Sequence, residues 1–318
     1  MLSAPSFAIA TQGLTKQFNR QRAVNNVDLE VEEGAVYGLI GPNGAGKTTL
    51  IRLLAMAEEA TTGEITLFGE RLIRGEGNLK LKQYLGYLPD DYPLYEDLSI
   101  WDYLDYFARL YFLTGPERRR RLWEVLELVQ LTSKKDAKIM TLSRGMKQRL
   151  SLARTLIHNP LLLLLDEPVS GLDPGARLQF REIVKLLRQA GMTVLISSHV
   201  LSDLQELCTA VGVMELGCLI ESSPLDALYR RLAARQLRIN VLEGLERLQD
   251  LLKTEGQVGE IQVEEDGRSL LCRYSGAPEE MADLLRVLVE SRIPITEFHT
   301  EQEDLESLFF KLGHQQVS

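Results

Sequence analysis

The spacing G-x-x-x-x-G-K-S/T is typical of a phosphate-binding loop and occurs at Gly41-Pro42-Asn43-Gly44-Ala45-Gly46-Lys47-Thr48. Glycines let successive backbone N–H groups curl around phosphate oxygens, because no Cβ atom stands in the way. Lys47 can reach the β- and γ-phosphates of a nucleotide, and the Thr48 hydroxyl can ligate Mg²⁺. An apolar run before the segment and a helical pattern after it supply the context that this chemistry needs. We therefore predict a phosphate-binding loop in preference to a glycine-rich turn beside a surface lysine.

A pair of carboxylates, Asp166 and Glu167, follows directly after the apolar run of residues 161–165. A buried strand that ends there places both carboxylates at the edge of the sheet where α/β folds bind ligands. Asp166 could hold Mg²⁺, directly or through water, and Glu167 could polarise a water molecule that attacks a terminal phosphate. The alternative is two solvated carboxylates at a strand end, which the phosphate loop upstream makes the weaker interpretation.

A second candidate anion site lies between these two motifs, in Leu142-Ser143-Arg144-Gly145-Met146. A helical pattern follows, and a helix N-terminus with a serine hydroxyl favours a negative group. On its own, the segment is equally typical of an ordinary capped helix.

Taken together, the motifs resemble those of the nucleotide-binding subunit of an ABC (ATP-binding cassette) transporter. Residues 142–146 resemble the family's LSGGQ signature, with Arg144 and Met146 as departures and with Ser143 and Gly145 kept. The segment Ser170-Gly171-Leu172-Asp173 resembles its D-loop, and His199 resembles its H-loop. The motifs follow the family's order over residues 7–223, about 70% of the chain.

The resemblance implies an ATPase that uses ATP and Mg²⁺ and powers an ABC-2-type membrane exporter. It implies that Glu167 activates water, that His199 contacts the γ-phosphate, and that each ATP lies between one chain's loop and another's signature. The dimer could be a homodimer or a heterodimer, and its partner would be an integral membrane permease. The implied nucleotide contacts are Phe18, Gly41, Pro42, Asn43, Gly44, Ala45, Gly46, Lys47, Thr48, Thr49, Ser143, Gly145 and Asp173.

Two positions depart from the family's common pattern. Asp90 stands where the Q-loop glutamine is expected, and an aspartate can still ligate Mg²⁺ but cannot donate a hydrogen bond when ionised. The implied metal contacts are therefore Thr48, Asp166 and Asp90. Phe18 stands where tyrosine is commoner, and stacking on the adenine base needs only the ring.

The elements that must position these residues suggest an α/β fold, a P-loop NTPase domain over residues 1–223. Short apolar runs at 36–40, 161–165 and 193–197 predict buried parallel strands. Consecutive helices at 100–113 and 117–131 predict a helical subdomain over about 95–155. Aromatic side chains crowd the first of these helices, either as core or, by the resemblance, as a groove for a helix of the membrane subunit. Four arginines at 118–121 favour a solvated helix face over a contact with anionic lipid.

The pattern changes near Pro224, and residues 224–318 predict a small α+β accessory domain. Strands at 237–242, 259–264, 269–274 and 295–299, with helices at 245–254 and 278–290, give the ferredoxin-like order β-α-β-β-α-β. Residues 304–312 predict a terminal helix, and residues 303–309 resemble the closing LEDxF pattern of ABC-2-type subunits. The segment carries no catalytic constellation, so we expect a structural or regulatory role.

Composition limits the other possibilities. A formal net charge of -9 argues against nucleic-acid binding, which needs a basic surface. Three cysteines without a CxxC pair, no long apolar run and no signal peptide suggest a cytoplasmic protein that meets the membrane through a permease. The alternatives are a soluble regulatory ABC ATPase and a nucleotide-binding module without turnover, and the presence of Glu167 and His199 disfavours the second.

Overall fold

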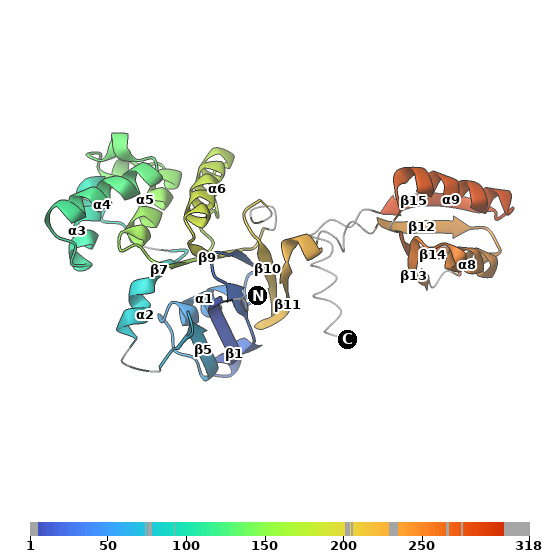
Figure 1. Cartoon of the computed structure of the whole chain (residues 1–318), viewed down its shortest axis with the longest axis horizontal. Coiled ribbons are helices and arrows are strands. Elements are labelled where there is room, and N and C mark those ends of the chain that lie inside the picture. The colour runs from blue at the N-terminus through green and yellow to red at the C-terminus, as the bar shows by residue number, and fades with distance from the viewer. Residues whose placement is uncertain are drawn as a thin grey trace, which may run out of the picture. The chain divides into compact units, whose positions relative to one another are not determined.

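The computed structural model describes residues 6–73, 75, 78–91, 93–200, 204, 206–228, 235–264, 267–274 and 276–301. The chain divides into two compact units, Met1–Leu225 and Asp226–Ser318 (Figure 1). The sequence-predicted terminal helix and the segment 303–309 lie outside the described residues. No helix in the described ranges is both long enough and apolar enough to cross a lipid bilayer.

A six-stranded sheet with the order β11-β10-β4-β9-β8-β7 forms the centre of the first unit. Its strands pair in parallel except at the β10–β11 edge. Every residue of β4, β8 and β9 is buried, which explains why none of these strands alternates between apolar and charged residues. β9 nevertheless carries three buried hydroxyl residues, Thr193, Ser197 and Ser198. The strands are β4 Val36–Ile40, β7 Leu85–Leu88, β8 Leu162–Leu165, β9 Thr193–Ser198, β10 Ala210–Glu215 and β11 Cys218–Pro224.

A second, antiparallel sheet precedes and follows the phosphate loop in the sequence, with the order β2-β1-β5-β6 and with β3 paired to β1. A single hydrophobic cluster joins it through helix α1 to the central sheet, with Leu14 of β1, Leu50 of α1 and Leu164 of β8 fully buried. The sequence analysis did not predict this sheet. Its strands are β1 Phe7–Phe18, β2 Gln21–Val27, β3 Glu30–Glu32, β5 Thr62–Leu67 and β6 Glu70–Arg71.

Helices α3, α4 and α5 pack against one another as a group (Figure 1). The serine side chain of Ser99 accepts a hydrogen bond from Asp102 N and so caps α3 at its start. The helices of the unit are α1 Lys47–Leu54, α2 Leu79–Tyr84, α3 Ile100–Leu110, α4 Gly115–Leu128, α5 Arg144–Leu156 and α6 Pro174–Gln189. Two 3₁₀ turns, η1 Thr132–Lys134 and η2 Ile139–Thr141, connect α4 to α5.

Two of the four arginines at 118–121 have structural partners, so the expectation of a simple solvated face is wrong for them. Arg118 Nε lies 2.8 Å from Asp105 Oδ1 on α3. Arg121 donates to the carbonyl oxygens of Leu156 and Ile157, at the C-terminal end of α5. The Arg118 contact ties α4 to α3, and the Arg121 contacts tie α4 to α5. A cation at a helix C-terminus satisfies carbonyl groups that the helix leaves free.

The second unit contains a four-stranded antiparallel sheet with the order β13-β14-β12-β15 and two helices. Leu237, Leu270 and Cys272 on the sheet pack against Leu248 of α8 and Leu288 of α9. The elements run β-α-β-β-α-β along the chain, as the sequence indicates. They are β12 Arg235–Val241, α8 Leu245–Thr254, β13 Val258–Val263, β14 Ser269–Tyr274, α9 Pro278–Glu290 and β15 Ile295–Glu301.

Candidate functional site

The glycine-rich loop connects β4 to α1, and its glycines leave room for close backbone approach. A Cβ atom on Gly41 would lie 2.2 Å from the carbonyl oxygen of Met214, so no side chain fits there. Gly46 has φ +104°, and a Cβ on it would lie 2.2 Å from the carbonyl oxygen of Ala23. Gly44 also has positive φ, +83°. The loop can therefore take its curled path only with glycine at these positions.

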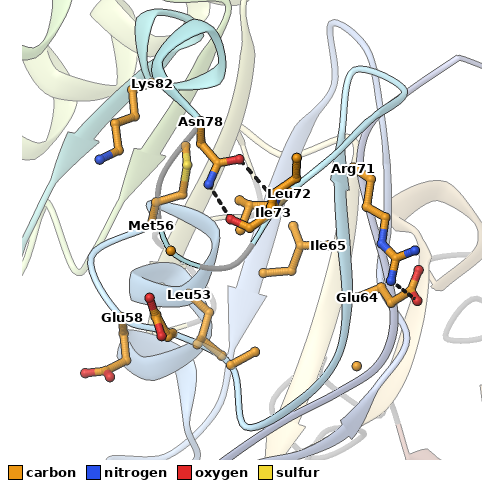
Figure 2. A pocket seen from close by; sticks show the side chains of 14 residues that line it. Leu53, Met56, Glu58, Glu64, Ile65, Arg71, Leu72, Ile73, Asn78 and Lys82 are labelled. Carbon is orange, nitrogen blue, oxygen red and sulfur yellow. Dashed lines mark hydrogen bonds and ion pairs between the residues drawn. The ribbon is translucent and has the colours of Figure 1, made fainter.

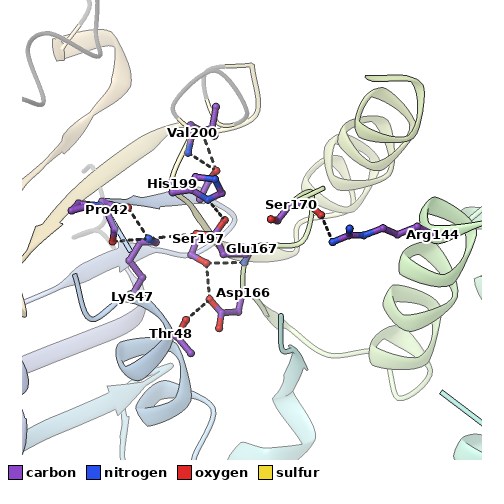
Figure 3. Close-up of polar contacts among 12 residues, drawn as sticks. Pro42, Lys47, Thr48, Arg144, Asp166, Glu167, Ser170, Ser197, His199 and Val200 are labelled. Carbon is purple, nitrogen blue, oxygen red and sulfur yellow. Dashed lines mark hydrogen bonds and ion pairs between the residues drawn. The ribbon is translucent and has the colours of Figure 1, made fainter. Parts of the chain in front are cut away.

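Lys47 points from the start of α1 back into this loop and toward the carboxylate pair (Figure 3). Its Nζ donates hydrogen bonds to the carbonyl oxygens of Gly41 at 2.7 Å and Pro42 at 3.2 Å. The same Nζ lies 3.4 Å from Glu167 Oε1. Lys47 is only 5% exposed, so the loop carbonyls and the Glu167 carboxylate surround its buried charge.

Asp166 lies at the end of β8 and is almost fully buried, at 1% exposure. Its Oδ1 accepts hydrogen bonds from Thr48 Oγ1 at 3.1 Å and from Ser197 Oγ at 2.8 Å (Figure 3). Within the described part of the chain, its Oδ2 is buried without a hydrogen-bond partner. Burial raises the pKa of Asp166 above its usual value, although the two hydroxyls oppose this shift. A buried carboxylate oxygen without a partner, beside a threonine hydroxyl, fits the hard oxygen ligands that Mg²⁺ prefers.

Glu167 adopts a left-handed backbone conformation, with φ +47°, which is uncommon for a residue with a side chain. Its backbone N donates to Ser197 Oγ at 2.9 Å, and its Oε2 lies 2.8 Å from His199 Nδ1 (Figure 3). One hydroxyl, that of Ser197, therefore contacts both members of the carboxylate pair. Ser197 is not among the residues that the sequence motifs single out, although a serine near the end of a buried strand and two residues before His199 is a signal that could have identified it.

An open pocket of about 350 Å³ brings most of the expected nucleotide contacts together. Its wall includes Phe18 at the end of β1, Asp90 after β7, and Glu167. Phe18 is 43% exposed, and Lys16 Nζ lies 4.7 Å from the centre of its ring. The loop residues that line the pocket are Asn43, Gly44, Ala45, Gly46, Lys47, Thr48 and Thr49. An aromatic ring at one side and a phosphate-type loop at the other match the two ends of a nucleotide.

The electrostatics of Asp90 depend on this position at the pocket wall. Burial raises its pKa, and the nearby carboxylates Glu167 and Asp91 raise it further. The electrostatic effects of Arg144 and His199 oppose this shift and lower the pKa of Asp90. A cation that bound among these carboxylates would reduce their mutual repulsion.

Ser143, Gly145 and Asp173 do not line this pocket, although the sequence analysis assigned all three to the nucleotide. Ser143 caps α5, where its Oγ accepts from Met146 N at 3.3 Å. Asp173 caps α6 in the same way. A Cβ on Gly145 would lie 2.7 Å from Ala176 Cβ, so a glycine is needed where the starts of the two helices meet. These residues form a separate group that a single chain does not bring to the phosphate loop.

A larger pocket, of about 440 Å³, lies between α1, β5 and α2 but contains no predicted site residue (Figure 2). Its floor is apolar, with Leu53 and Ile65, and several of its polar groups pair with one another. Asn78 exchanges two hydrogen bonds with the backbone of Ile73, and Arg71 pairs with Glu64. The smaller pocket at the phosphate loop is therefore the candidate site.

Comparison with protein families matches residues 24–170 to the family described as ABC transporter. The bacitracin transport ATP-binding protein BcrA of Bacillus licheniformis is 32% identical over 308 residues, covering 96% of this chain and 97% of that protein. The Nod factor export ATP-binding protein I of Bradyrhizobium diazoefficiens is 31% identical and covers 92% of this chain and 93% of that protein. An uncharacterized ABC transporter ATP-binding protein of Synechocystis, sll0415, is 39% identical over 201 residues, which span 63% of this chain and 56% of that protein.

Among solved structures, an ATP-binding subunit of an ABC transporter is 28% identical and superposes with a TM-score of 0.63. The match covers 78% of this chain and 100% of that structure.

Proposed function

The chain belongs to the ATP-binding subunits of ABC transporters, and on this premise we propose how its residues bind and hydrolyse ATP and which partners it serves. The observation that carries the proposal is the continuous chain of contacts from Thr48 through Asp166, Ser197 and Glu167 to His199. Each of these groups is held by the next, and two of them, Thr48 and Glu167, line the pocket at the phosphate loop. Such pre-arranged geometry is what phosphoryl transfer asks of a protein, because catalysis there is mainly positioning and charge stabilisation.

ATP binds in the open pocket, with its adenine base against the Phe18 ring and its phosphates within the loop Gly41 to Thr49. Lys47 turns from the loop carbonyls toward the phosphate oxygens, because a phosphate is a better partner for its charge than a neutral carbonyl. Thr48 and Asp166 would hold Mg²⁺, and Asp90, which lines the same pocket as Thr48, would offer a further carboxylate oxygen. A Mg²⁺ ion bound by these residues would supply positive charge to the phosphates.

Glu167 accepts the proton of the attacking water, and His199 holds the Glu167 carboxylate in place through its contact at Oε2. The left-handed backbone at Glu167 turns its side chain out of the strand end and into the pocket. Strain of this kind persists only where neighbouring contacts enforce it. The bond from Glu167 N to Ser197 Oγ is one such contact.

A second copy of the chain, or a related subunit, supplies Ser143, Gly145 and Asp173 to each nucleotide. In this chain the three residues lie at the starts of α5 and α6, outside the pocket. A helix N-terminus with free N–H groups stabilises an anion, so a γ-phosphate presented by the other copy would be a good ligand. ATP then closes the dimer, and hydrolysis opens it.

The dimer drives an exporter by docking on the cytoplasmic side of an integral membrane permease. Exposed aromatic groups at the start of the helical group support such docking. Tyr95 is 49% exposed, and its ring contacts Tyr106 and Phe107 of α3. A cluster of exposed aromatic rings is typical of a surface that receives a partner's helix.

The variant Glu167→Gln tests the assigned chemistry. We expect it to bind ATP, to lose about a hundredfold or more in turnover, and to accumulate as a dimer that light scattering detects. Glu182→Gln, on the exposed side of α6, is the matched control. An unchanged hydrolysis rate in Glu167→Gln would overturn the role of Glu167.

Membrane association tests the partner. The protein should bind membranes that contain a cognate permease and should wash off membranes that lack one. Full retention on permease-free membranes, or no binding to permease-containing ones, would favour a regulatory ATPase that is not coupled to transport.

A further inference from the structure

Arg144 is the first residue of α5 and stands in the signature segment, but its side chain reaches away from that segment. Its Nη2 donates a hydrogen bond of 3.0 Å to the carbonyl oxygen of Ser170 (Figure 3). Ser170 lies three residues after Glu167, between β8 and α6. A single side chain therefore joins the start of α5 to the loop that carries the proposed catalytic base.

The loop from Glu167 to Ser170 is a tight turn that needs support from its surroundings. Ser170 N donates to the carbonyl oxygen of Glu167 at 3.1 Å and closes the turn. Glu167 itself has φ +47°, a conformation that is strained for a residue with a side chain. Arg144 binds the carbonyl oxygen of Ser170, and the carbonyl oxygen of Glu167 binds its N–H, so both backbone polar groups of Ser170 are fixed.

Gly171 shows that the guanidinium packs against this loop as well as bonding to it. A Cβ on Gly171 would lie 2.5 Å from Arg144 Nη1 and 2.6 Å from its Cζ. Gly171 also has φ +64°, which disfavours a side chain independently. The flat guanidinium thus occupies the space beside the glycine, and two independent contacts define its position.

We propose that Arg144 is a positioning residue for ATP hydrolysis, which fixes the turn of Glu167 from the start of α5 in the same chain. This inference rests on the proposed function, because it requires Glu167 to be the base. Arg144 does not line the pocket at the phosphate loop and reaches the turn of Glu167 through the backbone of Ser170.

A dimer of this kind would have two composite ATP sites, and Arg144 would adjoin elements of both. Ser143 and Gly145 would contact the ATP that is bound to the other copy, whereas Glu167 acts on the ATP bound to its own chain. Arg144 lies next to the first pair and is bonded to the turn of the second. It therefore connects the two ATP sites, and its loss should weaken cooperativity between them as well as turnover.

The test compares Arg144→Ala, Arg144→Lys and the control Arg120→Ala in the full-length protein, each checked for an unchanged urea midpoint. Arg120 is exposed and pairs with Glu124 on its own helix. We expect Arg144→Ala to lower kcat about tenfold with KM for ATP within about twofold, because a charge-assisted hydrogen bond is lost away from the nucleotide. Arg144→Lys should recover part of the loss, since an ammonium can still donate to Ser170 O. The Hill coefficient for ATP should fall in Arg144→Ala only.

A kcat for Arg144→Ala within about twofold of the parent would overturn the inference, as would an equal loss in Arg120→Ala. The double variant Glu167→Gln/Arg144→Ala separates this inference from the proposed function. If Arg144 acts through Glu167, it adds no further loss in that background. A further tenfold loss would refute the route through Glu167. Full activity of Glu167→Gln alone would instead refute the proposed function.

Discussion

The three loop glycines offer a test in which steric overlap and backbone strain can be separated. Gly41→Ala would place a Cβ 2.2 Å from Met214 O at a residue whose φ is unremarkable. Gly44→Ala would force a side chain into φ +83° but would meet no atom within 4 Å. Gly46→Ala would do both, with φ +104° and a Cβ 2.2 Å from Ala23 O.

The expected magnitudes follow from these two causes. A left-handed conformation costs a residue with a Cβ about 1–2 kcal/mol. An overlap that forces a backbone shift costs about 1–3 kcal/mol, as overpacking does. We therefore expect losses in the free energy of unfolding of about 1–2 kcal/mol for Gly44→Ala, about 1–3 for Gly41→Ala and about 2–5 for Gly46→Ala.

Tryptophan fluorescence during urea unfolding of the nucleotide-free protein measures these losses in the first unit alone. The chain has two tryptophans, Trp101 and Trp123, and both lie in the first unit with ring centres 5.6 Å apart. If Gly46→Ala proved no more destabilised than Gly44→Ala, the close approach of the loop to Ala23 would not constrain its path. A loss in Gly44→Ala larger than in Gly46→Ala would contradict the reasoning altogether.

Three further changes have defined expectations. Ser197→Ala removes the hydroxyl that contacts both Asp166 Oδ1 and Glu167 N, so we expect a loss of about 2 kcal/mol in the free energy of unfolding and a lower kcat. Unchanged values for both quantities would count against the shared contact. Asp166→Asn should stabilise the nucleotide-free protein at neutral pH, because burial raises the folded pKa of Asp166 and the parent therefore loses stability as the pH rises from the unfolded pKa through the folded one. The stability gained by the variant should vanish at low pH, where Asp166 of the parent is protonated. Mg²⁺-dependent hydrolysis should be lost in the variant. Phe18→Ala should weaken ATP binding about tenfold while Phe18→Tyr keeps it, as equilibrium titration would show, and equal affinities in all three proteins would remove Phe18 from the base site.

Local patterns predicted many of the elements well. The runs at 36–40, 245–254, 269–274 and 278–290 coincide with β4, α8, β14 and α9. Strongly apolar strands bounded by turns, and helices with clear periodicity, carry their own signal. Residue chemistry alone predicts the loop and the carboxylate pair and leaves the segment 142–146 open between an anion site and a capped helix, whereas Phe18 is identified only through the family resemblance.

The N-terminal antiparallel sheet was missed because its strands carry little local signal. β1 mixes buried and exposed residues irregularly and contains shifts in register, so its alternation is broken. The contacts of Ser197 and Arg144 were missed for a different reason. Each joins residues about 25–30 positions apart, and only the packed sheet and helices bring such groups together.

The central claim is that each ATP lies between the loop of one copy and the signature of another, and mixing two inactive variants tests it directly. Lys47→Ala removes the phosphate contact in one variant, and Ser143→Arg blocks the helix N-terminus in the other. An equal mixture forms mixed dimers in about half of all pairs, and each mixed dimer has one intact composite site of two, so about a quarter of the parental hydrolysis rate should return. A mixture that hydrolyses ATP no faster than the average of the two separate variants would contradict the claim.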